Sequence, residues 1–310
     1  MTLQKKATVV SSSVAAFLTL IKFTIGILSG SVAVLASAVD SILDMFVSLF
    51  NYYAINNSEK PADEVFNYGR GKIEALASVI EGVIITMSGL FLLYTAIKKY
   101  YTNEISSYLS TSLVVMIISL VVTIALVIYL NKVAKKTNNM VIKADALHYK
   151  TDVWVNGAVL FSIIIVYFTG YEIVDIIIGA AISVFIIYSA YELIQEGVLV
   201  LLDRALDDEI SEQIIEIINN QDKVNDYHFL KTRGAGNNNF VDVHIVFDCI
   251  ITLFEAHRIA DIIEDKIKQI DDQKDWIINI HMDPYDDSDI NSDNNNKENC
   301  IITAKNNKED

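Results

Sequence analysis

Six stretches of about 20 mostly apolar residues fill the first two-thirds of the chain and constrain its fold more than any other feature. They lie at 9–30, 33–55, 77–97, 110–131, 150–169 and 173–194. A helix that rises 1.5 Å per residue crosses the hydrocarbon core of a bilayer, about 30 Å thick, in about 20 residues. Because lipid offers the backbone no hydrogen-bond partners, each stretch is predicted to be a membrane-spanning helix.

The segments that connect these stretches differ in positive charge, which indicates the orientation. With the N-terminus in the cytoplasm, ten basic residues lie on the cytoplasmic side: Lys5, Lys6, Lys60, Arg70, Lys72, Lys132, Lys135, Lys136, Lys143 and Lys150. Only Lys98 and Lys99 lie on the other side. Segments next to spans usually carry this excess of Lys and Arg in the cytoplasm. We therefore expect a multi-pass membrane protein with both termini cytoplasmic.

The last third of the chain has a different composition. Residues 1–202 hold 13 Lys and Arg against 14 Asp and Glu, whereas residues 203–310 hold 11 against 25. Because an acidic surface repels phosphates, we expect no nucleic-acid partner. The expected domains are a six-helix transmembrane domain at 1–202, a cytoplasmic domain at 203–285 and a disordered, acidic and Asn-rich tail at 286–310.

The cytoplasmic domain is predicted to be a small α+β unit. The spacing of its apolar residues predicts helices at 208–220 and 254–270, and strands at 226–233, 240–248 and 275–281. Cys249 and Cys300 have no partner at the spacing of a metal motif or a disulfide framework, which fits a reducing compartment.

Two pairs of metal-ligand residues occur in the apolar region at helical spacing. Asp40 and Asp44 lie well inside the second stretch, and His148 and Asp152 lie near the start of the fifth. Residues four apart share one helix face, and an Asp at the centre of a membrane helix costs about 2.5–3.5 kcal/mol to insert. One divalent cation would offset these charges together, since one imidazole and three carboxylates can form a four-coordinate zinc site. For His148 and Asp152 alone, an interfacial position is the alternative.

These pairs resemble a known family when they are combined with four further segments. The segments are Lys60-Pro-Ala-Asp63, Tyr68-Gly-Arg-Gly-Lys72-Ile-Glu74, Leu-Leu-Asp203-Arg204-Ala-Leu and Ile280-His281-Met-Asp283-Pro284. Together the motifs cover about residues 5–285 and are similar to those of the cation diffusion facilitator family, most of all its bacterial zinc and ferrous-iron efflux pumps. The resemblance implies six transmembrane helices followed by a ferredoxin-like, metallochaperone-like cytoplasmic domain, a homodimer, and proton–metal antiport through Asp40, Asp44, His148 and Asp152.

The resemblance also implies a second metal site in the cytoplasmic domain. It assigns a binuclear site to His228, His244, His257, His281 and Asp283, with Asp283 bridging two ions. From the residues alone, scattered surface histidines are the alternative. The resemblance further implies a structural ion pair between Lys72 and Asp203.

A third site of many relatives is expected to be lost here. Those relatives carry Asp-xx-His-xxx-His between the second and third spans, whereas this chain has Asp63, Phe66 and Arg70 at those positions. Phe has no ligand atom and a guanidinium repels a cation. Two charged residues within the apolar stretches have simpler interpretations: Lys22 reaches a headgroup, and Glu81 is interfacial.

The function expected is export of divalent metal ions from the cytoplasm by a secondary transporter of the bacterial inner membrane, which is embedded in lipid and exchanges metal for protons. Zinc or ferrous iron is the expected cargo and regulatory ligand, cadmium is also compatible, and no cofactor is expected. Manganese efflux is one alternative, although relatives tuned to manganese tend to have Asp at the His148 position. A membrane-anchored metal sensor is another. No nucleotide or nucleophile motif points to an enzyme.

Overall fold

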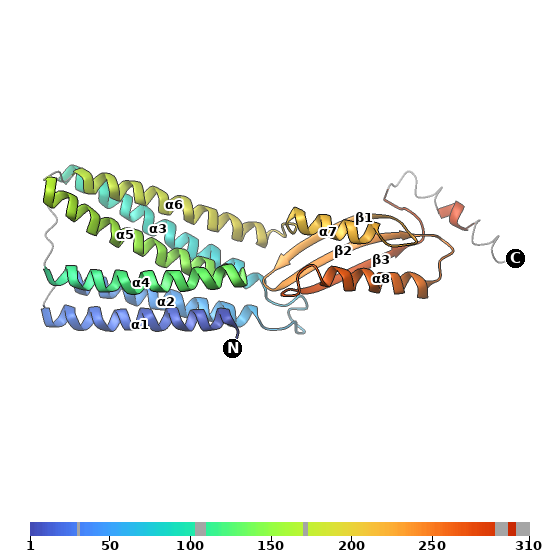
Figure 1. The fold of residues 1–310 in the computed structure, drawn as a ribbon, viewed down its shortest axis with the longest axis horizontal. Coiled ribbons are helices and arrows are strands. Elements are labelled where there is room, and N and C mark those ends of the chain that lie inside the picture. Colours follow the sequence, from blue (N-terminus) through green and yellow to red (C-terminus); the bar gives the residue numbers. More distant parts are fainter. Residues whose placement is uncertain (30–31, 103–109, 170–172, 289–296, 302–310) are drawn as a thin grey trace. The chain divides into compact units, whose positions relative to one another are not determined.

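The chain folds into two compact units, Met1–Leu201 and Leu202–Asp310. The structure is a computed structural model that describes residues 1–29, 32–102, 110–169, 173–288 and 297–301. The first unit is a bundle of six long helices (Figure 1): α1 Leu3–Ser29, α2 Val32–Ser58, α3 Lys72–Thr102, α4 Ser110–Thr137, α5 Met140–Thr169 and α6 Ile173–Leu201. Each apolar stretch thus falls on one helix, although residue 30 lies outside the described residues.

Helix α5 begins earlier than the apolar stretch indicated. It starts at Met140 rather than near residue 150, because a tight turn joins it directly to α4. Asn138 takes a left-handed conformation (φ 47°), and the side chain of Asn139 accepts a hydrogen bond from the amide of Ile142. That bond caps the first turn of the helix. His148 consequently lies inside a long helix rather than at its start.

Buried clusters on two sides hold the first half of α5 in place. Val141, Ile142 and Tyr149 pack with residues of α1, α2 and α4, whereas Ala144 packs with Ile186 of α6 and its neighbours. Helices α3 and α6 also approach closely, because a Cβ atom on Gly197 would lie 2.6 Å from Val79. The two clusters around α5 fix its rotation about its own axis, and with it the direction in which His148 points.

Four of the helices are long and apolar enough to cross a membrane: α1, α3, α4 and α6, in the segments Leu3–Ile25, Lys72–Lys98, Val114–Thr137 and Ile176–Leu201. The other two long helices, α2 and α5, do not meet this criterion within the described residues. They are the helices that carry the predicted metal ligands. Large apolar side chains such as Phe17 and Leu28 are exposed on the bundle, as expected of a surface that faces lipid.

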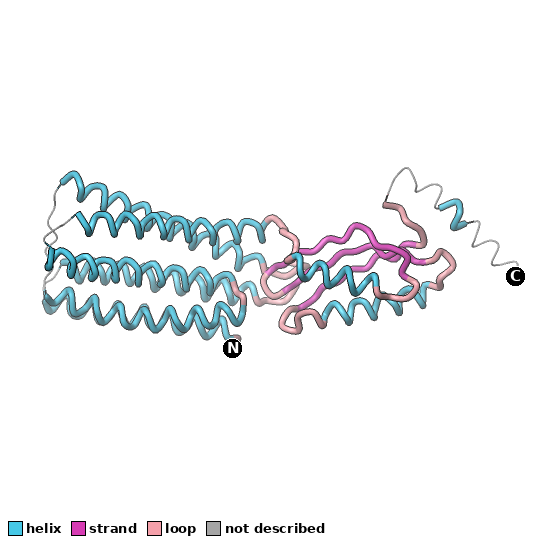
Figure 2. Tube along the Cα trace, turned by 45° about the horizontal axis from the view of Figure 1, so that its top comes forward, coloured by secondary structure: helices cyan, strands magenta, loops and turns pink. Residues whose placement is uncertain are grey.

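The second unit has two layers, a three-stranded sheet and two helices (Figure 2). Its elements are α7 Asp208–Asn219, β1 Val224–Ala235, β2 Asn238–Phe247, α8 Leu253–Lys268 and β3 Asp275–Asp283. The strand order is β1-β2-β3, with β1 antiparallel and β3 parallel to β2. These elements agree with the predicted helices and strands.

One face of the sheet carries the core of this unit. Val243 and Ile245 of β2 pack with Ile214 of α7 and Ile263 of α8 in a single buried cluster. Since successive side chains of a strand point to opposite faces, His244 lies on the face away from the helices.

Candidate metal centres

Three predicted ligands from α2 and α5 converge inside the helical unit. Single ligand atoms of Asp44, His148 and Asp152 all lie within 4.8 Å of one another. The Nε2 atom of His148 is 3.1 Å from Oδ1 of Asp44, and the side chains of His148 and Asp44 are 11% and 23% exposed. Two carboxylates and one imidazole at this spacing can bind one divalent cation.

Side-chain contacts align the two helices that supply these ligands. The buried hydroxyl groups of Ser48 on α2 and Tyr149 on α5 are 2.9 Å apart. Tyr149 directly follows His148 in the chain. Asp40 lies on α2 one turn before Asp44, but its side chain lies outside the described residues. Its place as a fourth ligand therefore stays a prediction, which rests on the shared helix face.

Beside this cluster lies a buried polar network that sequence reasoning missed. The amide of Asn51 donates to Oε2 of Glu81 (3.0 Å) and to Oδ1 of Asp145 (3.3 Å), and all three residues are at most 1% exposed. Glu81 is therefore buried and not interfacial. A signal was available, because Asn51 follows Asp44 by two helical turns and Asp145 precedes His148 by three residues. Lys22, expected to reach a headgroup, donates to Ser41 at 2.8 Å.

The second unit aligns three of its four histidines in one row across the sheet. His228 pairs with His244 in the β1–β2 register, and His244 pairs with His281 in the β2–β3 register. The register shifts immediately after His228, where Phe229 takes a left-handed conformation (φ 52°). Such bulges change the direction of nearby side chains. Adjacent rings are 5.1 and 4.5 Å apart between centroids.

Asp283, at the end of β3, lies between the three histidines. Its Oδ2 is 2.9 Å from Nδ1 of His244 and 3.4 Å from Nε2 of His228, and its Oδ1 is 3.0 Å from Nε2 of His281. The side chain is 7% exposed. One carboxylate with an oxygen toward each side can bridge two cations.

The cluster differs from the predicted set at two positions. His257 lies on the outer side of α8, 68% exposed, and its contact is Asp261 at 3.8 Å. The structure does not bring it to the row, so its role as a ligand stays a prediction. Asp287 joins the cluster instead: one ligand atom each from His228, His244, Asp283 and Asp287 lie within 4.8 Å of one another. From its composition, the segment that holds Asp287 was predicted to belong to a disordered tail.

Lys72 and Asp203, the predicted ion pair, each have contacts within their own unit. The ammonium of Lys72 donates to the carbonyl of Leu201 at 3.1 Å, and Asp203 lies 3.3 Å from Arg233. The pair itself stays a prediction.

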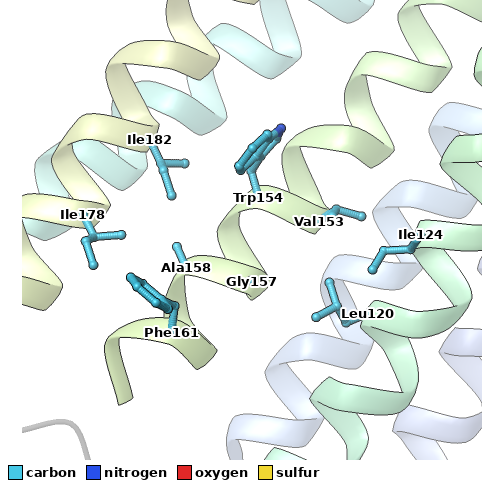
Figure 3. Close-up of a pocket in the computed structure, with 9 residues that line it drawn as sticks. All are labelled: Leu120, Ile124, Val153, Trp154, Gly157, Ala158, Phe161, Ile178 and Ile182. Atoms are coloured by element: carbon cyan, nitrogen blue, oxygen red, sulfur yellow. The ribbon is translucent and has the colours of Figure 1, made fainter. Parts of the chain in front are cut away.

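An apolar cavity of about 350 Å³ lies between α4, α5 and α6, and its lining includes Val153, the residue after Asp152. Figure 3 shows side chains such as Trp154, Phe161 and Ile182 around it. The described residues that line it have no carboxylate, imidazole or thiol, so they are unsuited to hold a metal ion.

Comparison with known proteins follows the same division into two units. A family model described as the cation efflux transmembrane domain matches residues 8–202. The chain belongs to the cation diffusion facilitator family. A second model, described as the cytoplasmic domain of cation efflux proteins, matches residues 206–285. Membership of this family makes the chain a membrane transporter for the efflux of metal cations.

Curated relatives in the cation diffusion facilitator family are similar over nearly their whole length. The cation-efflux pump FieF of Serratia proteamaculans is 35% identical over 282 residues, which cover 91% of this chain and 93% of that protein. The FieF protein of Citrobacter koseri is 36% identical over the same shares. Among solved structures, the zinc form of CzrB is 31% identical over 26% of this chain and 92% of that chain, with a TM-score of 0.23.

The loop that holds a third metal site in many members of the cation diffusion facilitator family is stabilised differently here. Asp63 accepts hydrogen bonds from the amides of Val65 and Phe66, and the Phe66 bond is the main cause that holds the pKa of Asp63 below its usual value. The guanidinium of Arg70 pairs with Asp63 and stacks 4.4 Å from the centre of the Phe66 ring. An internal cation thus contacts the carboxylate where a metal would bind.

Proposed function

We propose that this chain is a secondary transporter that exports divalent metal cations from the cytoplasm in exchange for protons, with zinc or ferrous iron as its main cargo and cadmium as a further one. The ion binds Asp40, Asp44, His148 and Asp152. In this proposal all six long helices span the bacterial inner membrane, both termini are cytoplasmic, and the transporter is a homodimer.

One observation carries this proposal: Asp44, His148 and Asp152 converge from two different helices of the apolar unit. Helices that only anchor a protein in lipid need no such group, and charged side chains there are expensive unless they have a function. A dication offsets the charges of both carboxylates. The curated relatives are named as cation-efflux pumps, which supports the same direction of transport.

The contact between His148 and Asp44 supports exchange against protons. A proton on Nε2 of His148 would lie between the imidazole and a carboxylate oxygen 3.1 Å away, where it satisfies both groups. A metal ion needs the same lone pairs, so it must displace the proton when it binds. Protons arriving from the acidic side then release the metal. The proton gradient sets the direction of the cycle.

The cytoplasmic cluster supports a second, regulatory site for the same ions. Three imidazoles and Asp283 suit zinc and its neighbours. The unit has the last five elements of the β-α-β-β-α-β order, which fits a ferredoxin-like domain. We infer that metal bound here favours one arrangement of the dimer, and that Lys72 and Asp203 contribute an ion pair to it.

The test is metal uptake by vesicles that contain the purified protein under an imposed pH gradient. Zinc, ferrous iron, cadmium and manganese are compared, with collapse of the gradient as the control. We expect gradient-dependent movement of zinc or iron. Faster movement of manganese than of either would favour the manganese alternative, and no movement of any ion would favour a membrane-anchored sensor.

A further inference from the structure

The segment that follows β3 turns back toward the row of histidines. Oδ1 of Asp287 is 2.9 Å from Nε2 of His228, the same nitrogen that lies 3.4 Å from Asp283. A helical turn follows at residues 297–301, where the thiol of Cys300 donates to the carbonyl of Pro284 at 3.7 Å. These contacts tie described parts of the acidic C-terminal region to the sheet.

Two buried atoms at this point have no hydrogen-bond partner among the described residues. They are Nε2 of His228 and Oδ1 of Asp287. The atoms are close enough for an ion pair, yet their directions do not form a hydrogen bond. The side chain of His228 is 10% exposed, so water does not easily satisfy it. A buried polar atom without a partner is costly, and a native structure rarely leaves two of them side by side.

A shared cation accounts for this geometry. Ligand atoms of a tetrahedral zinc site lie about 3.3 Å apart, since each is about 2.0–2.2 Å from the metal. The contacts of His228 with Asp287 and Asp283, at 2.9 and 3.4 Å, bracket this spacing. Ligands of one ion point their lone pairs at a common centre and not at one another. Close approach without a hydrogen bond, as between His228 and Asp287, is therefore expected of two ligands that share one ion.

The charge of the site leads to the same result. Two dications bridged by Asp283 alone would carry four positive charges against one negative charge, because neutral imidazoles contribute none. A second carboxylate on the ion next to His228 removes one unit of this excess. Asp287 is placed to supply it.

We propose that Asp287 is a ligand of the cytoplasmic metal position formed by His228, His244 and Asp283, and that metal binding there fastens the segment after β3 onto the sheet. This proposal rests on the cytoplasmic site of the proposed function. The ion it takes is a zinc-like dication, since two imidazoles and two carboxylates complete a four-coordinate shell.

Asp286 offers a matched control because it is the adjacent carboxylate with a different environment. Its Oδ1 accepts a hydrogen bond from the amide of Ser288 at 2.9 Å, and hydrogen bonds with Ser288 hold the pKa of Asp286 below its usual value. It lies 3.5 Å from Nδ1 of His228 but is not in the cluster of converging ligand atoms. Asp286→Asn and Asp287→Asn make the same chemical change one residue apart.

The experiment titrates the full-length protein in detergent with zinc against a chromophoric chelator. All variants carry Asp152→Ala, so that the transport site contributes little. We expect Asp287→Asn to weaken the binding of one zinc ion by at least about tenfold. Asp286→Asn should weaken it less than Asp287→Asn does, because Asp286 contacts His228 only through the other nitrogen. Hydrogen exchange of residues 284–288 is the second measurement: zinc should slow it in the parent and in Asp286→Asn, but not in Asp287→Asn.

His244→Ala separates the two possible failures. Suppose that His244→Ala loses zinc while Asp287→Asn matches Asp286→Asn in zinc affinity and in the slowing of hydrogen exchange by zinc. In that case Asp287 is no ligand and the cytoplasmic site stands. If His244→Ala binds zinc like the parent, the cytoplasmic site is absent and the role of Asp287 fails with it.

Discussion

The two candidate metal sites of this protein differ in what holds their predicted ligands. Asp44, His148 and Asp152 come from two helices, whereas His228, His244 and His281 come from three adjacent strands. Each helix makes its backbone hydrogen bonds internally, but the strands bond to one another. The helix ligands can therefore separate by a rigid shift of α2 against α5, whereas the sheet ligands cannot separate without breaking the sheet.

This difference fits two opposite requirements. A transport site must bind an ion on one side of the membrane and release it on the other, so its ligands need to change position or access during the cycle. A regulatory site acts by staying occupied when the metal is abundant, so a rigid frame suits it. In the proposed function, the same few residue types thus serve release in one unit and retention in the other.

The largest effect is expected at the helix-held site. Asp44→Ala or Asp152→Ala should reduce metal uptake by vesicles on the order of 100-fold or more, because a ligand of the moving ion is lost. The folded protein should persist, as measured by size-exclusion elution. Glu196→Ala is the control, since this carboxylate is exposed on α6 and pairs with Lys143. Uptake at the normal rate in both Asp variants would refute the transport site.

A smaller effect is expected on the polar network beside that site. Asn51→Leu removes the amide that donates to both Glu81 and Asp145, and should lower the free energy of unfolding by about 2–4 kcal/mol. Glu81→Gln keeps the shape of the side chain and an oxygen that can accept from Asn51, so its cost should be below about 1 kcal/mol. Thermal unfolding in detergent measures both. Equal losses of stability would show that Asn51 does not bridge the carboxylates.

The sheet-held site should affect binding more than transport. His244→Ala and Asp283→Ala should each lower the number of zinc ions bound per chain, measured by equilibrium dialysis, while uptake falls less than tenfold. His257→Ala tests the remaining predicted ligand. Because His257 lies away from the row of histidines, this variant should bind as many zinc ions as the parent. A loss of zinc with His257→Ala would mean that α8 contributes to the site in another arrangement, such as a dimer.

The smallest effect is expected in the loop between α2 and α3. Phe66→His with Arg70→His restores the Asp-xx-His-xxx-His pattern and removes the cation that now contacts Asp63. The double variant should bind one more zinc ion than the parent by equilibrium dialysis, whereas Asp63→Ala in the parent should bind the same number. A loss of zinc in Asp63→Ala would mean that the loop already holds a metal.

Much of the fold could be predicted from the sequence because its signals are local. The six apolar stretches locate the six helices, and the apolar alternation of 240–248 locates β2. The start of α5 was missed by about ten residues, since a membrane helix can extend past its apolar stretch into a charged segment such as the one that holds Lys143 and Asp145.

The candidate sites were predictable only in part. The motif indicated that Asp44, His148 and Asp152 act together, and their ligand atoms do converge, whereas the place of Asp40 beside Asp44 stays a prediction. Asn51 and Glu81 could not be joined from sequence, since their contact depends on how α2 packs against α3. Asp287 lies in a polar segment with little to bury, and such composition hides a contact that a few side chains make.

The most direct test of the account is to locate zinc in crystals of the protein by anomalous scattering at the zinc edge. We expect a peak within about 2.0–2.2 Å of Nε2 of His148 and of carboxylate oxygens from Asp44 and Asp152, besides the peaks in the cytoplasmic unit. Zinc confined to the cytoplasmic unit, with the ligands of α2 and α5 empty at saturating metal, would contradict it.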